Sequence, residues 1–168
     1  MLREPILDLF VPGDVKPAGS KRPLMAGGRL RVVDSSGDKG KQWRSDIKLT
    51  ALEALNGQAM TAGPIELDLV FVFPRPQGHL RTGRRAGELK ENAPTHHIKR
   101  PDVTKLVRAV EDALTGVVWP DDSQVMATQA VKVYADPGAQ PGARIKIYAA
   151  RAYGDAGIRG TLRPAALR

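Results

Sequence analysis

The clearest hydrophobic pattern in the chain is the alternation of apolar and polar residues over residues 64–73, PIELDLVFVF. It predicts a β-strand with one buried face, which the proline pair of Pro74-Arg75-Pro76 ends. Residues 6–11 predict a first strand that stops at Pro12-Gly13. Three further strands are expected at residues 29–34, 125–135 and 144–150. The turn-rich sequence DPGAQPGA predicts that the last two strands form a hairpin.

Two segments repeat apolar residues with the period of a helix. The first, residues 41–55, is followed by the stop signal Asn56-Gly57. One side of it carries Trp43, Ile47, Ala51, Ala54 and Leu55. The second begins near Asp102 and ends near Gly116, and its apolar arc must pack on a sheet. That arc consists of Val103, Leu106, Val107, Val110, Ala113 and Leu114. Strands and helices together predict one α+β domain.

Two irregular segments and a tail complete the expected organisation. Residues 16–23 contain two prolines and a glycine and predict a loop that presents Lys16, Lys21 and Arg22. Residues 75–100 are rich in Arg, Lys, Gly, Pro and His, which predicts a long, mobile, basic loop, although a disordered insertion has the same composition. We expect a domain over residues 1–153 and a flexible basic tail over residues 154–168.

Composition narrows the range of partners and chemistries. The chain carries 26 Lys and Arg residues against 18 Asp and Glu, a net charge of +8. Nucleic acid suits such a surplus because each neutralised phosphate releases counterions, although many basic proteins are only basic. The absence of cysteine excludes thiol nucleophiles, disulfides and cysteine-ligated metals. We find no signal peptide and no membrane span, and expect a cytoplasmic protein.

Candidate chemistry concentrates in residues 99–125. Asp102, Lys105, Arg108 and Asp112 fall outside the apolar arc of the second helix, on one side of it. The helix start therefore sets an acid beside cations, where free backbone amides also favour anions. Asp121 and Asp122 follow in a turn, and a chain that doubles back could bring them to Asp102. Carboxylates that are brought together suggest Mg²⁺, with Mn²⁺ as a substitute.

Each of these residues also has a purely structural interpretation. Asp102 is a good helix N-cap, and Arg108 with Asp112 could form a surface salt bridge. Asp121-Asp122-Ser123 has the composition of an ordinary turn. His96 and His97 are weak evidence for contact with metal or phosphate.

Taken together, the segment resembles the RusA family of Holliday junction resolvases. The family signature is a basic run, a helix start with two acids, an Asp-Ala-Leu, an aromatic residue and an Asp-Asp-x-Gln-Val. The matching residues are Lys99-Arg100-Pro101-Asp102, Lys105-Leu106-Val107-Arg108, Asp112-Ala113-Leu114, Trp119 and Asp121-Asp122-Ser123-Gln124-Val125. Residues 10–22 and Trp43-Arg44 resemble phage-type members more weakly.

The resemblance implies a mixed sheet of about four to five strands packed against two helices, a homodimer, and paired Mg²⁺-dependent nicks in four-way DNA junctions. By position, Asp102 and Asp122 correspond to family acids and Arg108 to the family's catalytic lysine. Since Arg does not donate its proton, a phosphate clamp suits Arg108 better. Thr104 stands at the family's second helix acid, and Asp121 could compensate as a metal ligand.

We therefore expect an endodeoxyribonuclease with Asp102, Asp122, Arg108 and Lys105 as catalytic residues. The metal ligands are expected to be Asp102, Asp121 and Asp122. The DNA-binding residues are expected to be Lys16, Lys21, Arg22, Arg84, Arg85, Lys99 and Arg100. A catalytically silent protein that binds branched DNA is the alternative suggested by Thr104. An RNA-binding protein has less support because the chain has few aromatic residues.

Overall fold

The computed structural model of this chain describes residues 3–19, 21–34 and 37–150. Six strands and two α-helices follow one another in the order β1, β2, β3, α1, β4, α2, β5, β6. Their bounds are β1 Leu7–Pro12, β2 Lys21–Ala26, β3 Arg29–Asp34, α1 Gly37–Leu55, β4 Ile65–Phe73, α2 Val103–Leu114, β5 Val125–Tyr134 and β6 Gly142–Ala149. The predicted α+β class and mixed sheet are confirmed. The predicted tail, residues 154–168, lies outside the described residues.

A mixed sheet of four strands in the order β1-β6-β4-β5 forms the centre of the fold. The β6 strand is antiparallel to both β1 and β4, whereas β4 and β5 are parallel. A parallel pair needs a crossover connection, and here α2 lies within it. The predicted hairpin of β5 with β6 is therefore wrong, because β4 lies between them. The turn composition correctly predicted that the chain reverses direction between β5 and β6. It did not indicate that β4 lies between these two strands.

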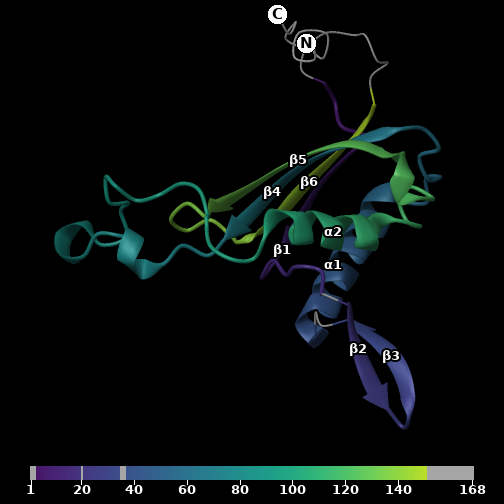
Figure 1. Cartoon of the computed structure of the whole chain (residues 1–168). Helices are drawn as coiled ribbons and strands as arrows, with labels where there is room; N and C mark the ends of the chain where they lie inside the picture. Colours follow the sequence, from purple (N-terminus) through teal and green to yellow (C-terminus); the bar gives the residue numbers. More distant parts are fainter. Residues whose placement is uncertain (1–2, 20, 35–36, 151–168) are drawn as a thin grey trace, which may run out of the picture.

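Both helices cover the same face of the sheet (Figure 1). The β4 strand buries alternate residues from Ile65 to Phe73, as its sequence predicts. On α1, Trp43, Ile47, Ala51 and Leu55 are buried, whereas Ala54 is exposed, against expectation. On α2, Leu106, Ala109, Val110, Ala113 and Leu114 are buried. Since this core holds α2 along most of its length, the charged side of α2 is held in place as well.

Two segments project from this layered body in Figure 1. The β2 and β3 strands form a separate antiparallel hairpin. Lys21 and Arg22 therefore lie in a strand rather than in the expected loop, and their side chains are outside the described part. Pro23 is tolerated there because a two-stranded ribbon has two free edges. No described helix is long and apolar enough to cross a membrane.

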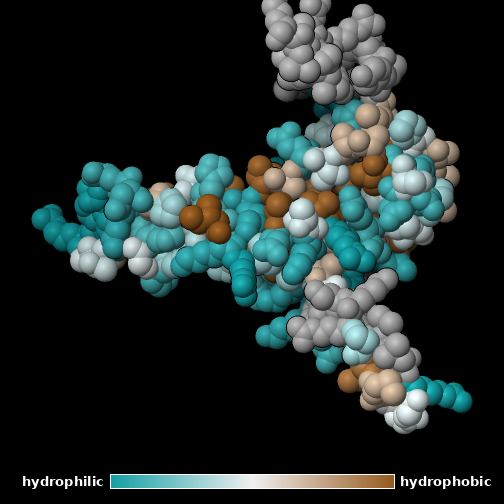
Figure 2. Space-filling model, viewed as in Figure 1, coloured by the Kyte–Doolittle hydropathy of each residue, from teal (hydrophilic) through white to brown (hydrophobic). Residues whose placement is uncertain are grey.

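The second projection, residues 75–100, we call the arm. It connects β4 to the segment before α2 and contains two short 3-10 helices, Gln77–His79 and Gly83–Arg85. Its surface is mostly hydrophilic (Figure 2), although Leu89 and Ile98 are exposed hydrophobic residues. Hydrogen bonds fasten its root to the sheet, from Tyr134 N to Thr95 O at 2.9 Å and from His97 N to Lys132 O at 2.9 Å. The arm is thus a folded extension with its own internal contacts.

Candidate functional site

The charged side of α2 faces solvent, as its sequence predicts. Asp102, Lys105, Arg108 and Asp112 are all exposed or partly exposed. They form two pairs along the helix, Lys105 Nζ with Asp102 Oδ2 at 3.5 Å and Arg108 Nε with Asp112 Oδ2 at 3.9 Å. Exposed pairs of this length stabilise a protein by about 0–1 kcal/mol. Their charged groups therefore remain available to a ligand.

The start of α2 shows what Asp102 does in the fold. Asp102 stands at the N-cap position with extended backbone, φ −68° and ψ 139°, but its side chain makes no capping hydrogen bond. Its carboxylate pairs with Lys105 instead. The backbone amides of the first helical turn therefore lack the side-chain hydrogen-bond acceptor that an N-cap residue usually provides. This end of α2 retains the anion-attracting character of a free helix N-terminus.

A cleft of about 610 Å³ opens beside this end of α2. Its lining consists of Val15, Lys16, Pro17, Arg100, Pro101, Asp102 and Lys105. The cleft therefore holds three cations and one carboxylate. A hydrogen bond of 2.9 Å from Ala18 N to Lys105 O fastens the loop that carries Lys16 against α2. Clustered Lys and Arg side chains of this kind suit the oxygens of a phosphate.

The opposite end of α2 is acidic, and it contains a residue that the sequence analysis missed. Glu111 is partly buried, and its pKa is raised by burial first, then by the charges of Asp122 and Asp112. The sequence analysis missed Glu111 because this residue lies next to the apolar arc and not among the charged residues on the exposed side of the helix. The available signal was its spacing, four residues after Val107 and three before Leu114, which places it at the edge of the buried face.

The turn that carries Asp121 and Asp122 is held by its neighbours on both sides. Trp119 is fully buried and donates from Nε1 to Thr115 Oγ1 at 3.1 Å. Gln124 donates from Nε2 to the carbonyl oxygens of Thr61 and Gly63, both at 3.0 Å. The aromatic residue and the Gln of the sequence signature therefore position the two acids of the turn.

Asp121 has the structural role that turn composition favours. Its Oδ1 accepts from the Ser123 amide at 2.9 Å, and its own amide donates to Gln124 Oε1 at 3.2 Å. Hydrogen bonds from the side chain and the backbone of Ser123 lower the pKa of Asp121. Asp121 thus caps the short 3-10 helix that begins at Asp122.

The three acids predicted to bind a metal ion lie near the two ends of α2. Over residues 3–19, 21–34 and 37–150, no three His, Asp or Glu side chains gather in a group that could hold a metal ion. Asp102 precedes the first turn of α2, whereas Asp122 acts on Glu111. At 1.5 Å per residue, Asp102 and Glu111 lie roughly 14 Å apart along the helix. The assignment of Asp102, Asp121 and Asp122 as metal ligands stays a prediction, with Asp102 at the start of α2 and the other two acids beyond its end.

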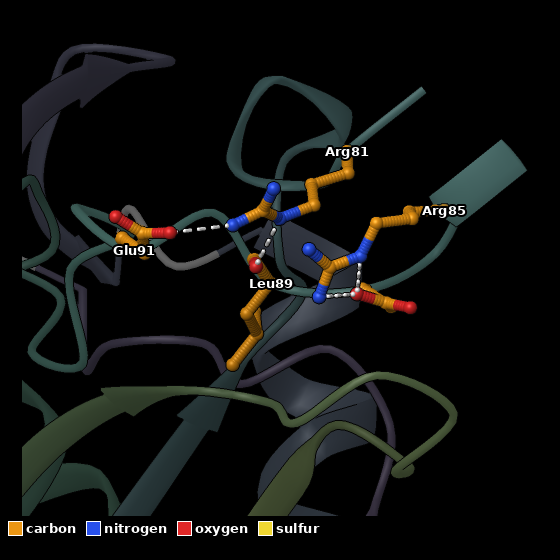
Figure 3. A network of polar contacts seen from close by, with 5 residues as sticks. Arg81, Arg85, Leu89 and Glu91 are labelled. Atoms are coloured by element: carbon orange, nitrogen blue, oxygen red, sulfur yellow. Dashed lines mark hydrogen bonds and ion pairs between the residues drawn. The ribbon is translucent and has the colours of Figure 1, made fainter. Parts of the chain in front are cut away.

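The expected DNA-binding residues of the arm lie on its exposed surface. Arg84, Arg85 and Lys90 line an open hollow of about 670 Å³ together with Arg81. Figure 3 shows how Arg81 and Arg85 are held, Arg81 by Glu91 Oε1 at 2.9 Å and by the carbonyl of Leu89, and Arg85 by Glu88 at 2.6 Å. Within residues 37–150, Arg84 forms no ion pair.

The two histidines at the root of the arm differ in their surroundings. His96 is exposed, whereas the ring of His97 stacks on Phe73 with centroids 4.0 Å apart and meets the edge of Tyr134. Burial, followed by the charge of Lys132, lowers the pKa of His97. His97 therefore fastens the arm to the sheet as a neutral aromatic ring.

Comparison with known proteins gives these features a family context. The family model described as Endodeoxyribonuclease RusA matches residues 14–148. The uncharacterized protein YqaN of Bacillus subtilis (strain 168) is 25% identical over 126 residues, which make up 75% of this chain and 86% of YqaN. The matched range includes the loop with Lys16, the arm, α2 and the Asp121-Asp122 turn. Both ends of α2 and the surfaces that flank them thus fall within the family match.

Proposed function

The chain belongs to the RusA family of endodeoxyribonucleases, and from that premise we propose that it resolves Holliday junctions or related branched DNA by paired, Mg²⁺-dependent phosphodiester hydrolysis. The observation that carries this proposal is the cleft at the start of α2, which Lys16, Arg100 and Lys105 line together with Asp102. A DNA strand that lies in this cleft has cations for its phosphates and a carboxylate beside them.

We propose distinct tasks for the charged residues along α2. Lys105 and Arg108 neutralise the phosphate that is cut, and Asp102 and Asp122 are the catalytic acids. Arg108 suits a clamping role since its pair with Asp112 is long, at 3.9 Å, and exposed. Lys16 and Arg100 hold the neighbouring backbone, while Lys99, Arg84 and Arg85 extend the basic surface along the arm. Lys21 and Arg22 provide further contacts from β2.

We further propose that the active form is a homodimer. A Mg²⁺ site needs several oxygen ligands, and the described part of one chain gathers no three acids or histidines. A second copy is the simplest source of the missing carboxylates. Two copies also match the symmetry of a four-way junction, which presents equivalent strands for two nicks.

The primary test is cleavage of a synthetic four-way junction by the full chain, with Mg²⁺ or with EDTA. We expect Mg²⁺-dependent nicks in two opposed strands, and no product in EDTA. Asp122→Asn should lower the cleavage rate at least about 100-fold, the scale of losing a group that stabilises transition-state charge. Asp136→Asn, an exposed acid beyond the end of β5, is the matched control. Equal cleavage by Asp122→Asn and parent would remove Asp122 from the site.

A mixing experiment tests whether two copies share each site. Asp102→Asn and Asp122→Asn are each inactive alone in this proposal. If Asp102 of one copy works with Asp122 of the other, a mixed dimer contains one intact site, and mixing restores nicking of one strand. If both acids act within one copy, no mixed dimer regains activity, and the proposal of a shared site fails.

The second candidate is a catalytically silent protein that recognises branched DNA. It is favoured by Thr104, exposed at the position of a family acid, and by the separation of the acids along α2. This candidate predicts tight junction binding without product at any concentration of Mg²⁺ or Mn²⁺. Competition with linear duplex and structured RNA then identifies the preferred ligand.

A further inference from the structure

Lys132 is a cation on the packed face of the sheet. It lies on β5, paired in register with Phe71 of β4, whose side chain is fully buried. Partners in a parallel pair point to the same face, so the Lys132 side chain leaves the sheet on the side that the helices cover. The β5 strand is also an edge strand, next to which the chain runs from the arm into α2.

The ammonium group of Lys132 joins two carbonyl oxygens in the segment that enters α2. Lys132 Nζ donates to Lys99 O at 2.6 Å and to Pro101 O at 2.7 Å. The carbonyl of Lys132 accepts from the His97 amide at 2.9 Å. Residues 98–101 belong to no helix or strand, so their carbonyl groups lack the regular partners that secondary structure supplies. Lys132 thus fastens this segment by both its backbone and its side chain.

The two clamped carbonyls lie on either side of Arg100, and Asp102 follows directly. Arg100 and Asp102 both line the cleft at the start of α2. Neither Arg100 nor its neighbour Lys99 is held by packing, because both side chains are exposed. The direction in which Arg100 enters the cleft is therefore set by the backbone that Lys132 holds.

We infer that Lys132 is a positioning residue for DNA cleavage, which sets Arg100 and Asp102 in the cleft by holding the backbone of residues 99–101. The inference rests on the proposed nuclease function. In this proposal Lys132 acts through the backbone and not on the DNA, since two of its three ammonium hydrogens are donated to carbonyl oxygens of the protein. The carbonyl groups need a donor of suitable length and direction, which the flexible ammonium of Lys provides.

The test compares Lys132→Met, Lys132→Arg and the control Lys146→Met in the full chain. Lys146 points to the outer face of the sheet, and its loss changes the net charge equally. We expect Lys132→Met to lower kcat for junction cleavage roughly 10- to 100-fold, as small misplacements in a site do, with a smaller change in KM. Lys132→Arg should recover part of the loss. Lys146→Met should retain the kcat and KM of the parent.

Hydrogen exchange of the protein without DNA provides a readout independent of activity. We expect the amides of residues 99–105 to exchange faster in Lys132→Met, and α1 and β4 to exchange as in the parent. A parent that cuts junctions, with unchanged kcat and exchange in Lys132→Met, would overturn the inference about Lys132. Loss of kcat only in proportion to the unfolded fraction would overturn it as well. A parent that cuts no junction overturns the proposed function, and exchange then still decides whether Lys132 holds the segment.

Discussion

The two ends of α2 differ in almost every electrostatic respect, although they share one helix. At its start, one carboxylate lies among three cations in an open cleft. At its end, burial raises the pKa of Glu111, and the charges of Asp122 and Asp112 raise it further. The helix dipole favours anions at the start and disfavours acids at the end. The start thus suits a phosphate, and the end has an arrangement that costs stability, as functional sites often do.

Removal of Trp119, which is buried near the acidic end of α2, should have the largest effect. Trp119→Ala leaves a large cavity beneath the Asp121-Asp122 turn and should lower the free energy of unfolding by about 3–5 kcal/mol. Denaturant unfolding monitored by circular dichroism measures this loss. Trp119→Phe keeps most of the packing and should cost clearly less. A smaller loss of stability in Trp119→Ala than in Trp119→Phe would show that Trp119 does not support the turn.

The second prediction removes two cations from the cleft at the start of α2 and concerns its affinity for DNA. Lys16→Ala combined with Arg100→Ala should weaken junction binding in EDTA roughly 10- to 100-fold. It should also reduce the slope of log Kd against log salt by about 0.9 for each phosphate that the variant no longer neutralises. Fluorescence anisotropy over a salt series measures both. The control is Arg144→Ala with Lys146→Ala, the same charge change on the outer face of the sheet. An unchanged slope in the Lys16 and Arg100 variant would remove the cleft from the DNA surface.

The smallest expected effect concerns the pH response of the acidic end. A carboxyl group with a raised pKa binds its proton more tightly in the folded chain than in the unfolded chain. Its contribution to stability is therefore present below the ordinary pKa of about 4.5 and declines as pH rises toward the folded value. Glu111→Gln should stabilise the protein at pH 7, by less than about 1 kcal/mol after screening, and this advantage should vanish near pH 4.

Thermal unfolding from pH 3.5 to 8 measures the effect of Glu111→Gln. A gain below about 1 kcal/mol corresponds to roughly 2–4 °C in Tm or less for a chain of this size. Glu53→Gln, an exposed residue of α1, should show no such pH-dependent gain. An equal gain at pH 4 and pH 7 would indicate that packing of the new side chain, and not relief of charge repulsion, stabilises the variant.

The sequence predicted those parts of the fold that depend on local periodicity. The alternation in β4 and the apolar arc of α2 led to nearly the observed bounds, because burial on one face imposes its own period. The pairing of β5 could not be obtained this way. Whether two strands joined by a turn become neighbours depends on β4, which is distant in sequence. Likewise, the strand that begins at Lys21 depends on its pairing with Asp34.

The same distinction between local pattern and distant packing applies to the residues of the candidate site. The charged side of α2 and the pair Arg108–Asp112 follow from helical spacing, and both are observed. Glu111 escaped notice because its burial and its proximity to Asp122 both depend on tertiary packing, which helical spacing alone does not reveal. Lys132 escaped notice because a lysine on an edge strand has the appearance of a solvated residue. Its role depends on carbonyl groups some thirty residues away.

The regular geometry of α2 also restricts how this protein can vary. A single residue inserted within α2 would turn the helical residues after it by about 100° relative to the Asp121-Asp122 turn, which Gln124 holds to Thr61 and Gly63, and would advance them by about 1.5 Å. Glu111 and Asp112 would then face away from Asp122, although the composition would hardly change. The arm is joined to the body only at its root, so its length can differ without that penalty. Lengths of α2 should therefore be uniform among functional relatives, and insertions should accumulate between Pro76 and Pro94.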